Sequence, residues 1–135
     1  MHSLSLRNDL AEIVRVTTWI EQQAAAFGLP SQTVYALQLC MEEAVTNVIS
    51  YAFQPGSTHA IQIRLWREGE ALFAEIRDDG SHFDPLAYES AAIGNDIDSV
   101  GIGGLGIKLM RSFAGSMTYQ RCAKTNRLLM SFPVS

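Results

Sequence analysis

The sequence has few cysteines, no basic cluster and no long apolar run. Its two cysteines, Cys40 and Cys122, lie far apart and outside any CxxC or Cys/His cluster, which argues against a structural zinc site. We expect both to be small buried side chains in a reducing compartment. No apolar run approaches the roughly 18 residues needed to span a bilayer. The composition therefore argues against a membrane protein.

Lys/Arg runs interleaved with aromatic residues are also missing, and the net charge is −4, so nucleic acid is not expected as a main partner. The N-terminal segment has no basic stretch followed by an apolar one, and we therefore expect a cytoplasmic protein without a secretory signal. With 135 residues, of which 47% are hydrophobic and 18% charged, the composition is that of a globular protein. A single domain over residues 1–135 is predicted.

Hydrophobic periodicity predicts an α+β fold. Apolar residues recur every three or four positions in some segments and every second position in others. The predicted helices cover residues 9–27, 31–52 and 104–114, and the predicted strands cover residues 2–6, 59–67, 71–78, 116–122 and 127–132. Residues 80–103 follow neither period, which is typical of a lid loop. This order predicts a two-layer sandwich in which helices cover one face of a mostly antiparallel sheet.

The second predicted helix carries two polar residues, Glu43 and Asn47, one turn apart on the same side. The rest of that row is small or half-apolar: Ala36, Cys40 and Tyr51. A carboxylate and an amide in such a row indicate a half-buried polar site, and ordinary helix-surface groups are the alternative. Glu42 and Thr46 fall on the opposite flank and are expected to face solvent.

A second stretch, Asp78-Asp79-Gly80-Ser81-His82-Phe83-Asp84-Pro85, follows a predicted strand. Alternation along that strand places Glu75 and Arg77 on its outward face and Asp78 on its inward face. A carboxylate that ends an apolar face needs a partner, because burying it alone is unfavourable. Since Gly80 permits close approach of a flat group, Asp78 could accept a hydrogen bond from an amine such as adenine N6. A β-turn with solvated acids is the alternative.

A third stretch, Gly101-Ile-Gly-Gly-Leu-Gly-Ile-Lys-Leu-Met110, leads into the third predicted helix. Glycines at a helix N-terminus can present backbone N–H groups to a phosphate. The dinucleotide-binding fingerprint does not fit, because a loop precedes the glycines and Asn126 stands where an acid is needed. A Walker A loop does not fit either, since Ile107 separates Gly106 from the lysine.

Together the three stretches carry a resemblance to a known family. Glu-Ala-Val-Thr-Asn (43–47), Asp-Asp-Gly…Phe-Asp-Pro (78–85) and Gly-Gly-Leu-Gly-Ile-Lys-Leu-Met (103–110) resemble the three nucleotide-binding boxes of the GHKL (Bergerat-fold) ATP-binding superfamily. Within it, the chain is most similar to the small bacterial anti-sigma-factor serine/threonine kinases of partner-switching systems. The likeness covers about residues 10–132, with the boxes in the family's order and spacing.

The resemblance implies ATP and Mg²⁺ as cofactors and a role for each matching residue. Glu43 would be the general base that takes the proton from an attacking serine hydroxyl. Asn47 would give its side-chain oxygen to Mg²⁺, and Asp78 would bind the adenine amino group. The residues implied in nucleotide binding are Asn47, Asp78, Gly80, Phe83, Gly101, Gly103, Gly104, Leu105, Gly106 and Lys108.

The resemblance also implies a function. The chain would be an ATP-dependent serine kinase that holds a sigma factor and phosphorylates an anti-anti-sigma antagonist of the STAS type. The first helix and first strand would form the surface for a protein partner or for a homodimer. Trp19 and Trp66 are either exposed on that surface or part of the core, and the sequence leaves this choice open.

Two departures from the family pattern favour a second hypothesis. His82 stands where the family often has a glycine, and Thr125-Asn126 replaces a common Gly-Thr, which puts a late nucleotide contact in doubt. A catalytically weak, nucleotide-gated protein-binding regulator would fit these changes. The detached catalytic domain of a histidine kinase ranks lower, because His2, His59 and His82 all fall in predicted strands or loops.

Overall fold

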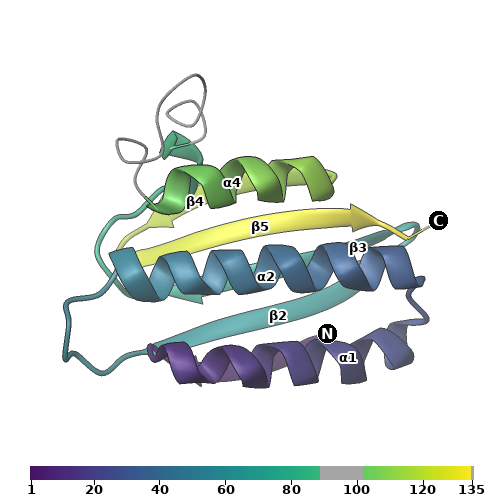
Figure 1. Cartoon of the computed structure of the whole chain (residues 1–135), viewed down its shortest axis with the longest axis horizontal. Helices are drawn as coiled ribbons and strands as arrows, with labels where there is room; N and C mark the ends of the chain where they lie inside the picture. Colours follow the sequence, from purple (N-terminus) through teal and green to yellow (C-terminus); the bar gives the residue numbers. More distant parts are fainter. Residues whose placement is uncertain (89–101, 135) are drawn as a thin grey trace.

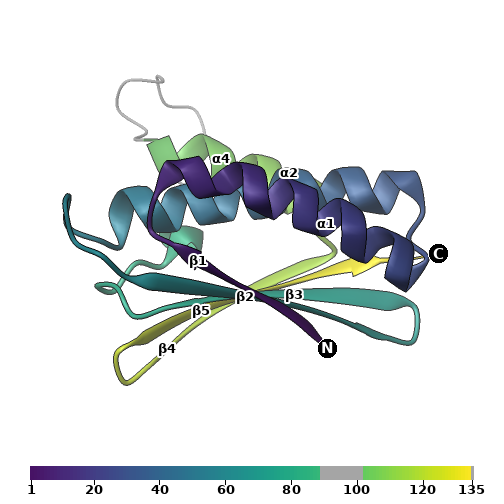
Figure 2. The ribbon, with the colours of Figure 1, turned by 90° about the horizontal axis from the view of Figure 1, so that it is seen from below.

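The computed structural model describes residues 1–88 and 102–134 and confirms the predicted α+β architecture. Its elements are β1 (His2–Arg7), η1 (Leu10–Glu12), α1 (Ile13–Phe27), α2 (Ser31–Tyr51), β2 (Ala60–Glu68), β3 (Ala71–Asp78), η2 (Pro85–Tyr88), α4 (Ile102–Phe113), β4 (Ser116–Cys122) and β5 (Thr125–Pro133). Within the described residues, five strands form one antiparallel sheet in the order β1-β2-β3-β5-β4. The helices α1, α2 and α4 lie side by side over it (Figure 1), and Figure 2 shows them all on one face.

The helix boundaries follow the capping residues in the sequence. The Asp9 side chain accepts a hydrogen bond from Ala11 N (2.9 Å) at the start of η1, and Gly28 ends α1 with a left-handed φ of 65°. The first turn after Asp9 is a 3₁₀ turn, so α1 begins later than predicted, at Ile13. Among the described residues, none of the helices combines the length and apolarity needed to cross a membrane.

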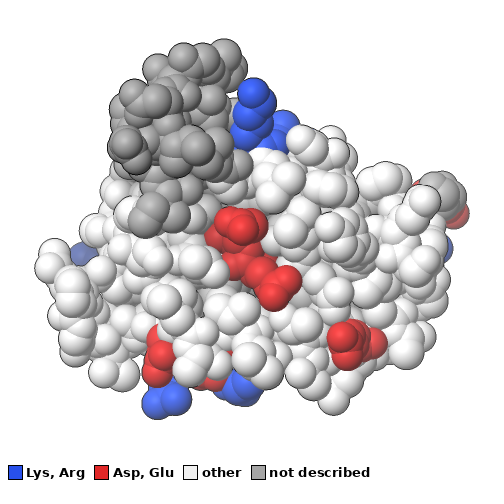
Figure 3. Space-filling model, viewed as in Figure 1, with Lys and Arg blue, Asp and Glu red and all other residues white. Residues whose placement is uncertain are grey.

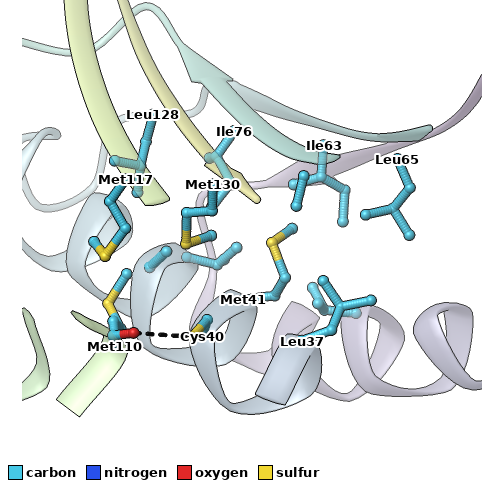
Figure 4. Close-up of a cluster of buried hydrophobic side chains, with 14 of the residues drawn as sticks. Leu37, Cys40, Met41, Ile63, Leu65, Ile76, Met110, Met117, Leu128 and Met130 are labelled. Atoms are coloured by element: carbon cyan, nitrogen blue, oxygen red, sulfur yellow. Dashed lines mark hydrogen bonds between the residues drawn. The ribbon is translucent and has the colours of Figure 1, made fainter. Parts of the chain in front are cut away.

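The core lies between α2 and the sheet. Figure 4 shows Leu37 and Met41 of α2 among side chains of the sheet, which include Ile63, Leu65 and Ile76; all five are at most 1% exposed. Methionines fill the spaces between the layers, where their flexible chains fit irregular gaps: Met41, Met110, Met117 and Met130. Trp19 packs half-buried against this core. The packing fixes α2 on the sheet and so fixes the polar row along its side.

The two cysteines differ in environment. Cys40 is buried between α2 and α4, with its sulfur 3.6 Å from the Met110 carbonyl oxygen, and burial raises the pKa of its thiol to about 12. It is the inert core side chain that the sequence predicts. The same prediction is wrong for Cys122, which is exposed because it ends β4 at the edge of the sheet.

The sheet face without helices is partly covered by its own side chains. Trp66 is half-buried and stacks on Phe73, with ring centroids 5.6 Å apart. Glu75 lies on this face, as alternation predicts, but it is not solvent-exposed. Arg64 and Arg127 lie over it and leave it 0% exposed.

The last hairpin is tighter than predicted. Only Ala123 and Lys124 form its turn, with a left-handed φ of 56° at Ala123, so β5 begins at residue 125 rather than 127. Asn126, which the sequence places in the connecting loop, therefore lies inside the sheet. It pairs with Asp78 of β3 on one side and with Arg121 of β4 on the other.

Candidate functional site

Glu43 and Asn47 lie where α2 meets α4. Asn47 is 2% exposed and Glu43 is half-buried, so the row predicted on α2 is a half-buried polar row. Gly106 of α4 packs directly on both residues. A Cβ at this glycine would lie 2.6 Å from Oε2 of Glu43 and 3.8 Å from Nδ2 of Asn47. Any larger residue would push the carboxylate away, so the glycine and the polar pair form one unit.

The side-chain amide nitrogen of Asn47 has no hydrogen-bond partner among the described residues. This Nδ2 atom is buried, although buried polar groups are nearly always paired. If the carboxamide turns by 180°, its oxygen takes this position. Such an oxygen fits Mg²⁺, a hard cation that keeps waters and takes few protein ligands. Among the described residues, no three His, Cys, Asp or Glu side chains gather into a metal site of their own.

The opposite flank of α2 differs from its prediction. Glu42 and Thr46 are half-buried rather than solvent-facing, and Oε1 of Glu42 accepts a hydrogen bond from the Thr17 hydroxyl of α1 (3.1 Å). Figure 3 shows acidic side chains gathered near the middle of the helix-covered side of the molecule. The two neighbouring glutamates therefore have different surroundings. Glu42 is bonded to α1, whereas Glu43 lies against α4.

Asp78 ends β3 on the helix side of the sheet, as predicted, and is 4% exposed. Its Oδ1 atom accepts hydrogen bonds from Gly80 N and from Nδ2 of Asn126, both at 2.9 Å. No described residue donates to its other oxygen, Oδ2. Burial raises the pKa of this carboxyl above its ordinary value of 3.8, and the two hydrogen bonds oppose the rise only in part. Among the described residues, Oδ2 is therefore the oxygen of this carboxylate that a ligand amine could reach without displacing a donor.

The space beside Asp78 is almost filled. A cavity of about 10 Å³ remains, lined by Ala44, Val48, Ile76, Asp78, Phe83, Pro85, Tyr119, Asn126 and Leu128. This volume holds at most about one water molecule. Phe83 is 7% exposed and stacks on Tyr51 of α2, with ring centroids 5.5 Å apart. Among the described residues, Phe83 and Pro85 therefore leave little open space on this side of Asp78.

Gly80 lies against the end of α2. A Cβ at this position would be 2.5 Å from the carbonyl oxygen of Ala52, and Ser81 donates its N–H to the same oxygen (2.8 Å). No side chain fits there unless the backbone moves. The sequence predicts that Gly80 leaves room for a flat ligand. The contact with Ala52 shows that a glycine is also needed here for the packing of the protein itself.

The glycine-rich stretch is already helical. The first turns of α4 contain four of the residues predicted to bind nucleotide: Gly103, Gly104, Leu105 and Gly106. Lys108 is exposed and lies in the second turn of α4, which begins at Ile102. The first N–H groups of a helix have no partner within it and favour a negative group nearby. Gly101 lies outside the described residues.

Asn126, which the sequence marks only as a departure from the family pattern, is 4% exposed and hydrogen-bonded to Asp78. Tyr119 and Arg121 of β4 donate to its oxygen, and neither was singled out from the sequence. The signal that could have found them is alternation along the last hairpin, which turns both toward the helices. His82 is exposed and lies edge-to-face on Tyr119, with centroids 5.7 Å apart, at the rim of this network.

The fold thus places Glu43 and Asn47 against the glycine-rich helix α4, and it places Asp78 at the end of β3 beneath the helix layer. The chain belongs to the histidine kinase-like ATPase domain family, whose sequence model matches residues 6–132. It is 31% identical over 135 residues to the serine/threonine-protein kinase BtrW of Bordetella bronchiseptica, and the match covers 95% of each chain. The family predicted from the three stretches is thereby confirmed.

Two solved structures share the fold. The histidine kinase domain of the Erythrobacter litoralis EL346 blue-light activated histidine kinase has a TM-score of 0.60 at 18% identity, covering 93% of this chain and 60% of that chain. The Acinetobacter baumannii histidine kinase AdeS has a TM-score of 0.53 at 11% identity, covering 100% of this chain and 70% of that chain. This chain thus spans less than two thirds of the first structure, and at these identities the likeness concerns the fold alone.

Proposed function

We propose that this chain is an ATP- and Mg²⁺-dependent protein serine/threonine kinase. The observation that carries the proposal is the place of Glu43, whose carboxylate lies against Gly106 and beside Asn47 where α2 meets the glycine-rich start of α4. A carboxylate is thus held next to a fitting magnesium ligand and next to a helix start that favours phosphate. The similarity to a serine/threonine-protein kinase over 95% of both chains supports the same activity.

In this proposal the base of ATP lies beside Asp78 and its phosphates lie near the start of α4. The free oxygen of Asp78 accepts a hydrogen bond from the adenine amine, and Lys108 supplies a positive charge near the phosphates. Asn47 holds Mg²⁺, which when bound neutralises phosphate charge. Phosphoryl transfer needs little beyond positioning and charge neutralisation, so this short set of residues is sufficient.

Glu43 acts as the general base. It takes the proton of the serine hydroxyl as that oxygen attacks the terminal phosphorus of ATP, whose bond to the bridging oxygen breaks so that ADP leaves. Its half-buried position keeps the carboxylate near the reacting atoms, and Gly106 keeps the space beside it free of a side chain.

The proposed substrate is a serine of a STAS-type anti-anti-sigma antagonist, and the proposed second partner is a sigma factor, which the chain sequesters in the cytoplasm. The resemblance of the three sequence boxes to partner-switching kinases supports these partners. The surface formed by α1 and β1 is the proposed contact, either with a partner or with a second copy of the chain.

A matched pair of variants tests the activity. Wild-type protein, Glu43→Gln and Glu42→Gln are each mixed with Mg²⁺, γ-labelled ATP and candidate antagonist proteins, and phosphoserine is measured by mass spectrometry. We expect Glu43→Gln to bind ATP like the wild type but to transfer phosphate about 100-fold or more slowly, the usual loss for a general base. Glu42→Gln should transfer normally, because that glutamate contacts Thr17 on the other flank.

Normal transfer by Glu43→Gln would remove Glu43 from the mechanism. If the wild type binds ATP but phosphorylates no antagonist, the second hypothesis holds, in which the chain is a catalytically weak, nucleotide-gated regulator that binds proteins. The segment from Gly80 to Pro85 favours that hypothesis as an alternative. Gly80 contacts Ala52 at the end of α2, and Phe83 and Pro85 line the cavity beside Asp78. A nucleotide that displaces this segment would therefore also change the surface at the end of α2.

A further inference from the structure

Asn126 has every hydrogen-bonding group of its side chain in use. Three donors reach its Oδ1 atom: the Tyr119 hydroxyl (2.5 Å), Nη1 of Arg121 (3.0 Å) and Phe83 N (3.4 Å). Its Nδ2 atom donates to Oδ1 of Asp78 (2.9 Å) and to the Ser81 carbonyl (2.8 Å). A carboxamide has two N–H donors, and both are taken. Asn126 is therefore not free to donate to a nucleotide itself.

The three donors decide which way the carboxamide points. Each brings a hydrogen, so only the oxygen can face them and the nitrogen must face Asp78. Arg121 is itself held by the Gly80 carbonyl, with Nη1 at 2.8 Å from the oxygen. Asn126 and Asp78 are also directly opposite each other on β5 and β3. The direction of the hydrogen bond between them is thus built into the sheet.

We propose that Asn126 is a positioning residue that sets the base preference of the site through Asp78. The inference rests on the proposed function, in which Asp78 binds the base. Asn126 Nδ2 and Gly80 N both donate hydrogen bonds to Oδ1, so Oδ2 is the oxygen that would bind the ligand. Because both donors bond Oδ1, the carboxylate stays ionised and its Oδ2 can only accept a hydrogen bond from the ligand. It therefore favours adenine, which presents an amine, over guanine, which presents a carbonyl at the corresponding atom.

The surroundings of Asp78 make this hydrogen bond matter. Burial is the largest cause of the raised pKa of Asp78, and the hydrogen bond from Asn126 is the largest of the effects that lower this pKa. The other groups that act on it are few: Asp79 raises the pKa, Arg121 and Gly80 N lower it, and the Tyr119 hydroxyl faces it across Asn126. From α2 the cavity is lined by Ala44 and Val48, which carry no charge. Without its donor, Asp78 would be protonated more readily and would lose its character as a pure acceptor.

The near-isosteric variant Asn126→Asp tests the proposal. The new carboxyl still accepts from Tyr119, Arg121 and Phe83 N, but it places an oxygen where a donor faced Asp78. Two buried carboxyl groups at this distance share a proton and titrate together. As the pH rises the pair loses this proton and the two carboxylates repel, so we expect the variant to bind ATP about tenfold more weakly than wild type at pH 8. At pH 6 a shared proton restores the donor, so the ratio of variant to wild-type Kd should fall toward one.

The measurement is calorimetry of MgATP and MgGTP binding at pH 6, 7 and 8. Asn8→Asp is the matched control, because Asn8 uses its carboxamide in the same way, accepting from His59 N (2.8 Å) and donating to the Ser57 carbonyl (3.0 Å) away from Asp78. We expect this control to lower stability without a pH-dependent change in the Kd ratio. Tyr119→Phe removes one of the three donors and should reduce the preference for ATP over GTP by about threefold.

The outcomes separate this inference from the proposed function. Wild-type protein that binds no ATP would contradict the proposed function itself. If wild type binds ATP and Asn126→Asp matches its Kd and its ATP/GTP ratio at every pH, Asn126 has no positioning role. If Asn126→Asp does not fold, an unchanged ATP/GTP ratio in Tyr119→Phe overturns the proposal, and a reduced ratio supports it.

Discussion

Two buried carboxylates on β3 lie three positions apart and face opposite sides of the sheet. Glu75 is 0% exposed on the side without helices, and Asp78 is 4% exposed on the side covered by helices. The two have opposite pKa shifts although both are buried. That difference follows from their partners, and it separates a structural acid from one that remains available to a ligand.

Glu75 is fully paired with positive charge. Arg64 and Arg127 hold one oxygen each, at 2.8 and 2.5 Å, and Nε of Arg77 lies 4.0 Å from the first oxygen. Burial alone would raise the pKa of Glu75, but the hydrogen bonds from Arg127 and Arg64 lower it below its ordinary value of 4.5. Nothing about this carboxylate requires a ligand.

Asp78 is held by amides instead of cations. Its donors, Gly80 N and Asn126 Nδ2, both end on Oδ1, and burial raises its pKa. A buried carboxylate with one unused oxygen and no directly bonded cation is a weak contributor to stability. An acid with only one oxygen hydrogen-bonded, rather than the most buried acid, is therefore the stronger candidate for a ligand site.

The largest expected effect is on nucleotide binding by Asp78→Asn. This variant keeps an oxygen for Gly80 N and Asn126 Nδ2 but puts an amide donor where Oδ2 faces the adenine amine. ATP binding should weaken by about 2–3 kcal/mol, while the free energy of unfolding changes by less than about 1 kcal/mol. Calorimetry and urea denaturation of the same preparations measure the two quantities. Unaltered ATP affinity would place the base elsewhere.

Glu75→Gln should show the reverse pattern. Removing the charge leaves Arg64 and Arg127 uncompensated, and we expect the free energy of unfolding to fall by about 2 kcal/mol, less than for a fully buried pair, because both arginines are about one third exposed. ATP affinity should remain within twofold of wild type. A large loss of affinity without loss of stability would break the distinction between the two acids.

The pH dependence of stability should also differ in sign. The lowered pKa of Glu75 contributes stability that is present above about pH 4.5 and is lost as the pH falls through its folded-state pKa. The raised pKa of Asp78 acts in the opposite direction, because the folded state takes up a proton more readily as the pH falls. Urea denaturation between neutral pH and about pH 4 should therefore show the wild type losing stability relative to Glu75→Gln and gaining it relative to Asp78→Asn.

Asn47→Leu is expected to raise stability slightly rather than lower it. Because the buried Nδ2 atom of Asn47 has no partner among the described residues, an apolar side chain of similar size should stabilise the protein by about 1 kcal/mol. In the same variant, Mg²⁺ should no longer strengthen ATP binding. Calorimetry with Mg²⁺ and with EDTA checks this, and a retained difference between the two would exclude Asn47 as the magnesium ligand.

The layers and several side chains of the candidate site could be predicted because they depend on local periods. The spacing of Glu43 and Asn47 follows from helix geometry, and the inward face of Asp78 follows from alternation. Asn126 could not be placed, because its pairing with Asp78 requires a two-residue turn. Ala123 adopts a positive φ there without being a residue type that marks such turns.

The filled space beside Asp78 was likewise beyond prediction. It depends on Phe83 stacking on Tyr51 and on Gly80 fitting against Ala52, which are contacts between segments far apart in sequence. Burial of Glu75 also depends on distant partners, since Arg64 and Arg127 come from neighbouring strands on either side. Alternation gives the face of a strand but not the side chains that cover it.

The pairing of β3 with β5 has a consequence for the order in which the protein is made. Asn126 follows Asp78 by 48 residues, and β5 follows every other described element of the site in the sequence. At about 5–20 residues per second, the ribosome adds these residues in roughly 2–10 s. During that interval the central strand has one open edge and its acid has no partner from β5. A nascent chain therefore cannot form the complete base site before its last strand has emerged.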